Sequence, residues 1–350
     1  MGPPAGIGYA RMRTPPLALD CTIFAGPIEG AGMKYRWLGN TGLPVSVIGV
    51  GTWQLGGEWG QRYTHFEVDQ LLGRARELGV NLLDTAECYG DHLAEALIGG
   101  AIHLQRDDWV VATKFGHQFH PDALQNAGRS PVQLRTDHWT PTEVIAQLEA
   151  SLRALRTDYV DLYQMHSGSD EVFSNDDLWE ALNQQVAQGK VHHLGMSVSG
   201  GDADQARRAS EVGASVIQVG YNRLDQTAEQ GVLAVCLDQD LGVMVREPLA
   251  NGYLSGKYRP GVWVTATDDW RSGHDPAEVQ RKLALVEDIW RTEVPEGVAM
   301  AAWAIAWCLQ QPAVSGVVAG CRSVQQLESN AAAADLDLVR DDHPRSVAAP

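Results

Sequence analysis

Eight short apolar runs, each followed by a stretch with helical spacing, constrain the fold of this 350-residue chain more than any other feature. The runs are VSVIGVG, VNLLDTA, WVVATKF, YVDLYQMH, VHHLGMSV, SVIQVGYN, LGVMVREP and VSGVVAG. They are nearly continuously apolar, which is typical of strands that are buried on both faces of a parallel sheet. The pattern therefore predicts that strand and helix alternate along the chain.

Helical spacing appears between these runs, for instance in VDQLLGRARELG, LAEALIGGAIHL, PTEVIAQLEASLRALR, DDLWEALNQQVAQG and DADQARRASEVG. Several of these stretches begin after Asp, Thr-Pro or Asn and end at Gly, as helices do. No linker divides the strand-helix units, so the pattern favours one (β/α)8 TIM barrel of the α/β class. An Asn-Thr-Gly turn predicts an N-terminal β-hairpin, and AEVQRKLALVEDIW predicts an extra helix after strand 7.

The Gly-rich first strand raises the alternative of a doubly wound sheet that binds a dinucleotide at its first turn. Gly49 and Gly51 would require a third glycine at the position that Gln54 occupies. The phosphate-binding turn of that fold is therefore not supported.

Both ends of the chain differ in composition from the part between them. Residues 1–32 are rich in Pro and Gly, and a second Met stands at position 33, where the patterned sequence begins. We interpret 1–32 as a disordered extension or a mis-called start, 33–338 as a single barrel domain and 339–350 as a flexible tail.

Composition excludes several classes of protein. Lys and Arg number 27 against 44 Asp and Glu, a net charge of −17, whereas binding to nucleic acid needs clustered cations. The five cysteines form no C-x-x-C pair, which indicates a reducing cytoplasm. No apolar run approaches the roughly 18 residues of a membrane span, and no signal pattern precedes the barrel. We expect a cytoplasmic protein without a membrane or nucleic-acid partner.

Four polar residues lie at or just after the ends of neighbouring apolar runs, where a barrel of this kind carries its active site. Asp84 ends the second run and Tyr89 follows in its loop, Lys114 lies near the end of the third run and His166 ends the fourth. Taken singly, each has a structural interpretation, such as a turn cap or a neutralising cation. Together they supply the cation that a buried Asp84 needs.

The chemistry that fits these four groups is proton transfer coupled to reduction of a carbonyl. A nearby ammonium stabilises a phenolate and is expected to lower the pKa of Tyr89, which would then act as general acid. Asp84 would orient Lys114, and His166 would donate to the carbonyl oxygen.

From about Met33 to Asn330 the chain resembles the aldo-keto reductase superfamily in DTAECYG, ATKFG, LYQMH and LEASLRALRTDYVDLY, in that order. The resemblance implies a (β/α)8 barrel, a catalytic tetrad of Asp84, Tyr89, Lys114 and His166, and a nicotinamide dinucleotide, usually NADP(H). The expected activity is NADPH-dependent reduction of an aldehyde or ketone to an alcohol.

The resemblance also implies a set of cofactor-binding residues. Gly51 and Trp53 would border the nicotinamide, Ser197 and Gln218 its carboxamide, Arg322 and Ser323 the 2′-phosphate, and Gln326 and Asn330 the adenine. Arg322 and Ser323 stand where a helix begins, which favours a phosphate, although an ordinary helix cap explains them equally. The full set is Gly51, Trp53, Asp84, Ser197, Gln218, Arg246, Pro248, Leu249, Lys257, Gly320, Arg322, Ser323, Gln326 and Asn330.

Two positions depart from the family pattern. Val198 follows Ser197 where many relatives have Asn, and Arg246 stands where many stack an aromatic ring on the nicotinamide. A guanidinium can stack too, but an oxidised, cationic nicotinamide would repel it.

No metal is assigned. His192 and His193 are adjacent on a strand and point to opposite faces, and His117 and His120 have no further ligands nearby in the sequence.

Two other functions remain open. One is a non-catalytic, nicotinamide-binding, redox-sensing subunit, because channel-associated β subunits of the family keep the barrel and cofactor. The other is an isomerase or aldolase on the same barrel. The substrate is expected to be a small carbonyl compound in a pocket walled by Trp53, Trp59, His117, Trp139 and Trp263. No oligomeric state follows from the sequence.

Overall fold

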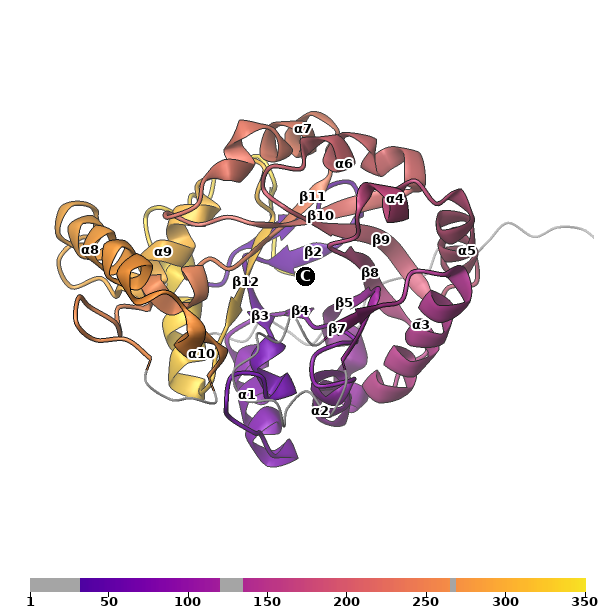
Figure 1. Ribbon diagram of the computed structural model, residues 1–350, viewed down its shortest axis with the longest axis horizontal. Helices are drawn as coiled ribbons and strands as arrows, with labels where there is room; N and C mark the ends of the chain where they lie inside the picture. The colour runs from indigo at the N-terminus through magenta and orange to yellow at the C-terminus, as the bar shows by residue number, and fades with distance from the viewer. Residues whose placement is uncertain (1–31, 120–134, 265–268) are drawn as a thin grey trace, which may run out of the picture.

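The computed structural model describes residues 32–119, 135–264 and 269–350. Eight parallel strands close into a barrel, and helices surround it (Figure 1). In barrel order the strands are β3 (Ile48–Gly51), β4 (Leu82–Asp84), β5 (Val110–Phe115), β8 (Val160–His166), β9 (Val191–Val198), β10 (Ala214–Gly220), β11 (Gly242–Arg246) and β12 (Gly316–Gly320). Each predicted apolar run contains one of them, except that β10 begins one residue before its run, so the predicted TIM barrel is confirmed.

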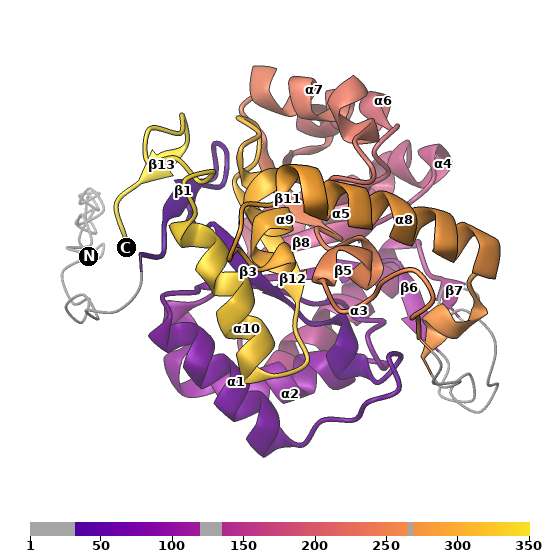
Figure 2. The same ribbon diagram turned by 90° about the vertical axis from the view of Figure 1, so that its left-hand side faces the viewer.

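The predicted N-terminal hairpin is also present. Its strands, β1 (Tyr35–Trp37) and β2 (Pro44–Ser46), pair antiparallel. Leu38 and Val45 of the hairpin form one apolar cluster with Leu82 and Val110, which are the first residues of β4 and β5. The hairpin therefore covers the N-terminal end of the barrel, while the β6 (His117–Phe119) and β7 (Arg135–Asp137) pair lies at the opposite end (Figure 2).

The helices begin at the capping signals that the sequence carries. Thr64 and Thr140 each form a capping box with the Glu three residues later, and Asn175 and Asp275 accept the N–H of the first turn. The predicted extra helix after the seventh barrel strand is α8. The helices are α1 (His65–Glu77), α2 (Leu93–Ile102), α3 (Pro141–Leu155), α4 (Asp170–Phe173), α5 (Asp176–Ala187), α6 (Ala203–Arg208), α7 (Val232–Asp238), α8 (Pro276–Glu293), α9 (Met300–Leu309) and α10 (Val324–Ala331).

The C-terminal segment differs from the flexible tail that its composition predicts. β13 (Ser346–Val347) pairs with β1, and the buried Arg345 donates to Asp240 Oδ1 and Leu241 O, both at 3.0 Å. These partners are more than a hundred residues away in the sequence, so no local pattern signals the contact. In the three described ranges, no helix is long and apolar enough to cross a membrane.

Candidate active site

Lys114 lies inside the barrel with no exposed surface, and its ammonium group has three hydrogen-bond partners. Nζ donates to Asp84 Oδ2 at 3.0 Å, to Thr85 O at 2.6 Å and to the Tyr89 hydroxyl at 3.2 Å. Strands β4 and β5 are adjacent and parallel, and Asp84 lies opposite Ala112, two residues before Lys114. This register brings the two charged side chains together. An ammonium has three N–H donors, so this one is fully satisfied despite its burial.

Asp84 is held by more than its lysine. Its Oδ1 accepts a hydrogen bond from Gln218 Nε2 at 2.6 Å and a longer one from Gln164 Nε2 at 3.4 Å. The amide nitrogen of Gln218, which the family resemblance places at the cofactor carboxamide, thus binds the carboxylate of Asp84. Sequence reasoning missed Gln164, which sits in β8 two residues before His166 and looks like any other residue of that strand.

Tyr89 contacts the ammonium from the loop after β4, and its side chain is largely buried. The ring stacks on Trp53 with ring centres 6.3 Å apart. Burial raises the pKa of Tyr89 to about 12, although the Lys114 ammonium acts to lower it. The expectation of a lowered pKa was therefore wrong, because loss of hydration of the phenolate outweighs the attraction of one cation that is already paired with Asp84.

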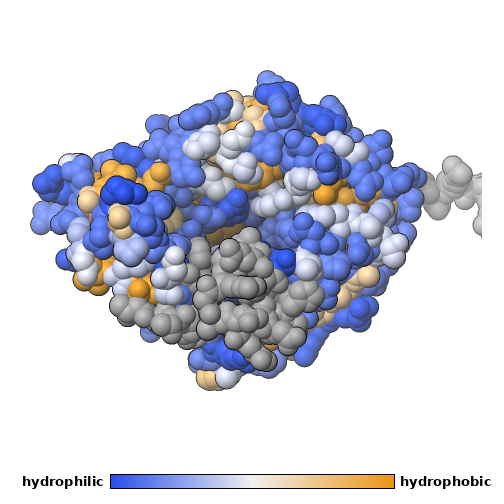
Figure 3. All heavy atoms as spheres, viewed as in Figure 1, coloured by the Kyte–Doolittle hydropathy of each residue, from blue (hydrophilic) through white to orange (hydrophobic). Residues whose placement is uncertain are grey.

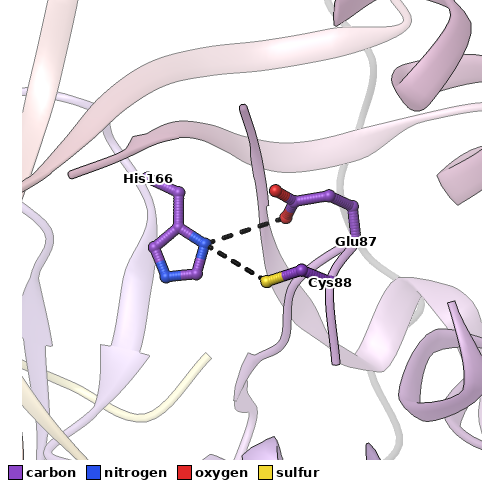
Figure 4. Close-up of side chains that lie close together, drawn as sticks. All are labelled: Glu87, Cys88 and His166. Atoms are coloured by element: carbon purple, nitrogen blue, oxygen red, sulfur yellow. Dashed lines mark hydrogen bonds and ion pairs between the residues drawn. The ribbon is translucent and has the colours of Figure 1, made fainter. Parts of the chain in front are cut away.

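His166 ends β8 and meets Tyr89 edge to face, with ring centres 6.1 Å apart. Burial, followed by the charge of Lys114, holds the pKa of His166 well below its usual value, so the imidazole is neutral. Nδ1 faces the Cys88 thiol at 3.7 Å and Glu87 Oε2 at 3.9 Å, and the other ring nitrogen points away from both (Figure 4). The first contact is within reach of a sulfur hydrogen bond, and the second is too long for one.

Glu87, Cys88 and His166 are ligand types that metals use, and one atom from each lies within 4.8 Å of the others. The sequence pattern pointed only to histidine pairs as possible metal ligands, and no metal was assigned to them. Cys88 and His166 are 78 residues apart, so no local spacing links them. Of those histidines, His192 stacks on Tyr159, and His117 places Nε2 2.7 Å from the acceptor His166 O and Nδ1 3.0 Å from Asp137 Oδ1. His120 lies outside the described residues.

A cavity of about 590 Å³ opens at the C-terminal ends of the strands and runs from Tyr89 to Asn330. The face in Figure 3 is hollowed near its middle, where polar and apolar side chains meet. Every residue of the expected cofactor set except Ser323 lines it, as do Tyr89 and His166 of the tetrad. Ser323 is the N-cap of α10, and its hydroxyl accepts the N–H of Gln326 at 3.3 Å.

Arg322 meets an acidic residue that sequence reasoning missed. Its Nη2 lies 3.3 Å from Asp269 Oδ2, and Asp269 also binds Arg271 at 2.6 Å. Both guanidinium groups pack over the Trp59 ring, at 5.2 Å for Arg322 and 4.8 Å for Arg271. Asp269 is the N-cap of the short 3-10 helix Trp270–Gly273, which contains Arg271. No sequence motif marks either residue, so only the long-range contact with Arg322 reveals them.

The lining of the cavity fits an anionic dinucleotide. Although the chain carries a net charge of −17, five cations among the described residues line this cavity: Arg135, Arg246, Lys257, Arg271 and Arg322. Arg246 ends β11, pairs with Glu247 and places Nη2 3.4 Å from Val198 O. Local cations of this kind are what a phosphate needs on an acidic protein.

Glu58 is another buried carboxyl group, and it contacts the loop of Tyr89. Its Oε1 accepts the N–H of Gly90 at 3.1 Å, whereas Oε2 has no hydrogen-bond partner in the part of the chain that the structure describes. Burial raises the pKa of Glu58 to about 7. Gly56 is needed beside it, because a Cβ there would lie 2.3 Å from Oε2.

Comparisons with known proteins agree with this architecture. The sequence model of the aldo/keto reductase family matches residues 47–349. The chain is 31% identical over 322 residues to the uncharacterised oxidoreductase YrpG of Bacillus subtilis, covering 88% of this chain and 93% of that protein. An NADH-specific methylglyoxal reductase of Escherichia coli is 29% identical, with 87% and 95% covered.

Two further relatives bear on function and fold. A probable voltage-gated potassium channel subunit beta of Arabidopsis thaliana is 29% identical over 317 residues, covering 87% of this chain and 92% of that protein. Among solved structures, the holo form of aldo-keto reductase AKR11C1 from Bacillus halodurans superposes with a TM-score of 0.70 at 26% identity, covering 87% of this chain and 92% of that one.

The raised pKa of Glu58 predicts a specific pH dependence of stability. Between 4.5, its ordinary value, and about 7 the folded state binds more protons than the unfolded state, so Glu58 reduces stability as pH rises. We expect Glu58→Gln to match the parent near pH 4.5 and to be about 3 kcal/mol more stable at pH 8, at roughly 1.36 kcal/mol per pKa unit. Urea unfolding across this range measures it, with the exposed Glu287→Gln as control. A difference that does not vary with pH would contradict it.

Proposed function

The chain belongs to the aldo/keto reductase family and is an NAD(P)H-dependent oxidoreductase, and on this premise we propose that it reduces aldehydes or ketones to alcohols with NADPH. The observation that carries the proposal is the Lys114 ammonium held between Asp84 Oδ2 and the Tyr89 hydroxyl, beside a cavity that Tyr89 and His166 line. A phenol in this position can deliver a proton to a carbonyl oxygen.

Tyr89 is the proposed general acid. Its raised pKa keeps the phenol protonated at neutral pH, which is the form that reduction of a carbonyl requires. As the proton leaves, negative charge develops on an oxygen 3.2 Å from Nζ of Lys114, which stabilises it. Asp84 keeps the ammonium in place, so little reorganisation accompanies the transfer.

His166 is the proposed second donor to the carbonyl oxygen. A neutral imidazole carries one ring proton, and a Cys88 thiol that donates to Nδ1 at 3.7 Å leaves this proton on Nε2. Burial raises the pKa of Cys88 well above its ordinary value, so the thiol keeps its proton. Nε2–H then helps to orient the substrate beside Tyr89.

The nicotinamide cofactor, when bound, supplies the hydride that reduces the carbonyl carbon. Ser197, Gln218 and Arg246 are proposed to hold its nicotinamide end, because they line the cavity on adjacent strand ends near Asp84. Gln326 and Asn330 are proposed at the adenosine end with Arg322. Since Gln218 Nε2 is bound to Asp84, its amide oxygen is the atom that can accept from a carboxamide.

A non-catalytic redox-sensing subunit is the second candidate, favoured by the plant relative named as a channel subunit. The two candidates differ in turnover, which a panel of small aldehydes and ketones resolves through the loss of NADPH absorbance. We expect steady turnover of at least one class. Cofactor binding without turnover of any carbonyl would favour the second candidate.

We further propose a cytoplasmic location and small-molecule partners, without nucleic acid or membrane.

Tyr89→Phe tests the assignment of the acid. The ring and its stacking on Trp53 remain while the proton donor is lost, so we expect turnover to fall by roughly 10²–10⁴ and NADPH affinity to stay near that of the parent. The matched control is Tyr159→Phe, which removes a hydroxyl that binds Asp107 instead. Turnover within a few-fold of the parent would remove Tyr89 from the mechanism.

Cofactor preference is the second test. We expect the parent to bind NADPH more tightly than NADH, and Arg322→Ala to lose about 1.5–3 kcal/mol of NADPH binding, the range for hydrogen bonds to charged groups. NADH affinity should change little. The substitution should not leave Asp269 unpaired, because Asp269 keeps Arg271 as its partner at 2.6 Å. Fluorescence titration of both cofactors against both proteins measures this. Equal affinities in the parent would contradict the preference.

A further inference from the structure

Arg135 is a cation at the catalytic end of the cavity. It begins β7, pairs with Phe119 across the hairpin that follows β5, and lines the cavity together with Tyr89 and His166. Its guanidinium carbon lies 6.0 Å from the ring centres of both Trp53 and Tyr89. The family resemblance did not include this residue, and it stands in no motif.

The Arg135 side chain makes no hydrogen bond and no ion pair with any other described residue, and its Nε is buried. Burial acts to lower the pKa of Arg135, but nearby ionisable groups outweigh burial and raise it, so the guanidinium stays charged. A partly buried guanidinium whose buried Nε has no acceptor among the described residues can bind a ligand that supplies one.

The other charges that line the catalytic end are paired. Asp84 binds Lys114 at 3.0 Å, Asp137 lies 3.0 Å from Nδ1 of His117, and Glu247 pairs with Arg246. At the cofactor end, Arg271 and Arg322 share Asp269. Lys257, which also has no ion pair among the described residues, lies 5.4 Å from the Tyr258 ring and belongs to the expected cofactor set.

Two nearby carboxyl groups do not supply the acceptor that the Arg135 guanidinium lacks. Glu87 and Glu58 act on Arg135 through their charge, but neither forms an ion pair with it. Glu87 Oε1 accepts the N–H of His117 at 2.8 Å, and Glu58 Oε1 accepts that of Gly90. Neither residue lines the cavity, so an anion that enters it meets the guanidinium of Arg135 from the open side.

We propose, resting on the proposed reductase function, that the substrates are carbonyl compounds that carry a carboxylate, and that Arg135 binds this carboxylate beside Tyr89. The planar fork of a guanidinium matches the two oxygens of a carboxylate. During reduction the carbonyl carbon gains the hydride of NADPH and the carbonyl oxygen gains the Tyr89 proton. The cofactor is oxidised, and the carboxylate is unchanged.

The test compares two substrates that differ at one position, where one carries a carboxylate and the other its uncharged methyl ester. 4-Carboxybenzaldehyde carries the carboxylate, and methyl 4-formylbenzoate presents the same aldehyde and ring with the charge removed. At saturating NADPH we expect kcat/KM of the parent to be about ten- to a hundredfold higher for the acid, mainly through KM, as a charge-assisted hydrogen-bond pair implies.

Variants assign this preference to Arg135. In Arg135→Gln we expect the ratio of acid to ester to fall to about one or below, because only the acid has a carboxylate that loses its cation. Arg135→Lys keeps the charge without the fork and should give an intermediate ratio. Arg153→Gln, an exposed arginine on α3, should leave the ratio of the parent unchanged.

A binding measurement separates this proposal from the proposed function. Benzoate should quench tryptophan fluorescence of the parent through Trp53. It should bind at least tenfold more weakly to Arg135→Gln, and it should bind Arg153→Gln as tightly as the parent. Binding of benzoate through Arg135 without turnover of any aldehyde would sink the reductase while keeping the carboxylate subsite. The proposal would be overturned if the parent had equal kcat/KM for the ester and the acid, or if the ratio of the two kcat/KM values were unaltered in Arg135→Gln.

Discussion

The buried ion pair between Lys114 and Asp84 is the interaction on which the rest of the site depends. An ammonium with no exposed surface is tolerated only because all three of its protons have acceptors, one of which is the Tyr89 hydroxyl. Removing any acceptor would leave a charge without hydration. The barrel therefore holds Tyr89 in place with the same contacts that make a lysine acceptable in its interior.

Burial decides the protonation states around this pair more than neighbouring charges do. It raises the pKa of Tyr89 to about 12 and of Glu58 to about 7, and it lowers that of His166. All three groups consequently favour their neutral forms. A neutral phenol and a neutral imidazole are proton donors suited to a carbonyl oxygen, and a charged Lys114 remains to stabilise the anion that forms.

The cavity has a consistent arrangement of charge along its length. On a chain with a net charge of −17, cations are concentrated where anions are expected to bind. Arg322 and Arg271 share one carboxylate, Asp269, so each retains capacity for a phosphate. Arg135 has no such partner among the described residues and lies beside the rings of Trp53 and Tyr89, which is why it and the cofactor-end cations are assigned to different ligands.

The sequence by itself determined the eight strands, the helix caps and the strand-end positions of Asp84, Lys114 and His166, because periodicity and capping are local properties of the chain. Tertiary structure alone decided that Gln164 and Gln218 bind Asp84, that Asp269 meets Arg322, that Cys88 faces His166 and that the C-terminal residues pair with β1. It also decided the pKa of Tyr89, where burial outweighs the cation that the sequence correctly placed nearby. These features depend on which segments the closing barrel brings together and how much water it excludes, and neither is encoded in any short stretch of residues.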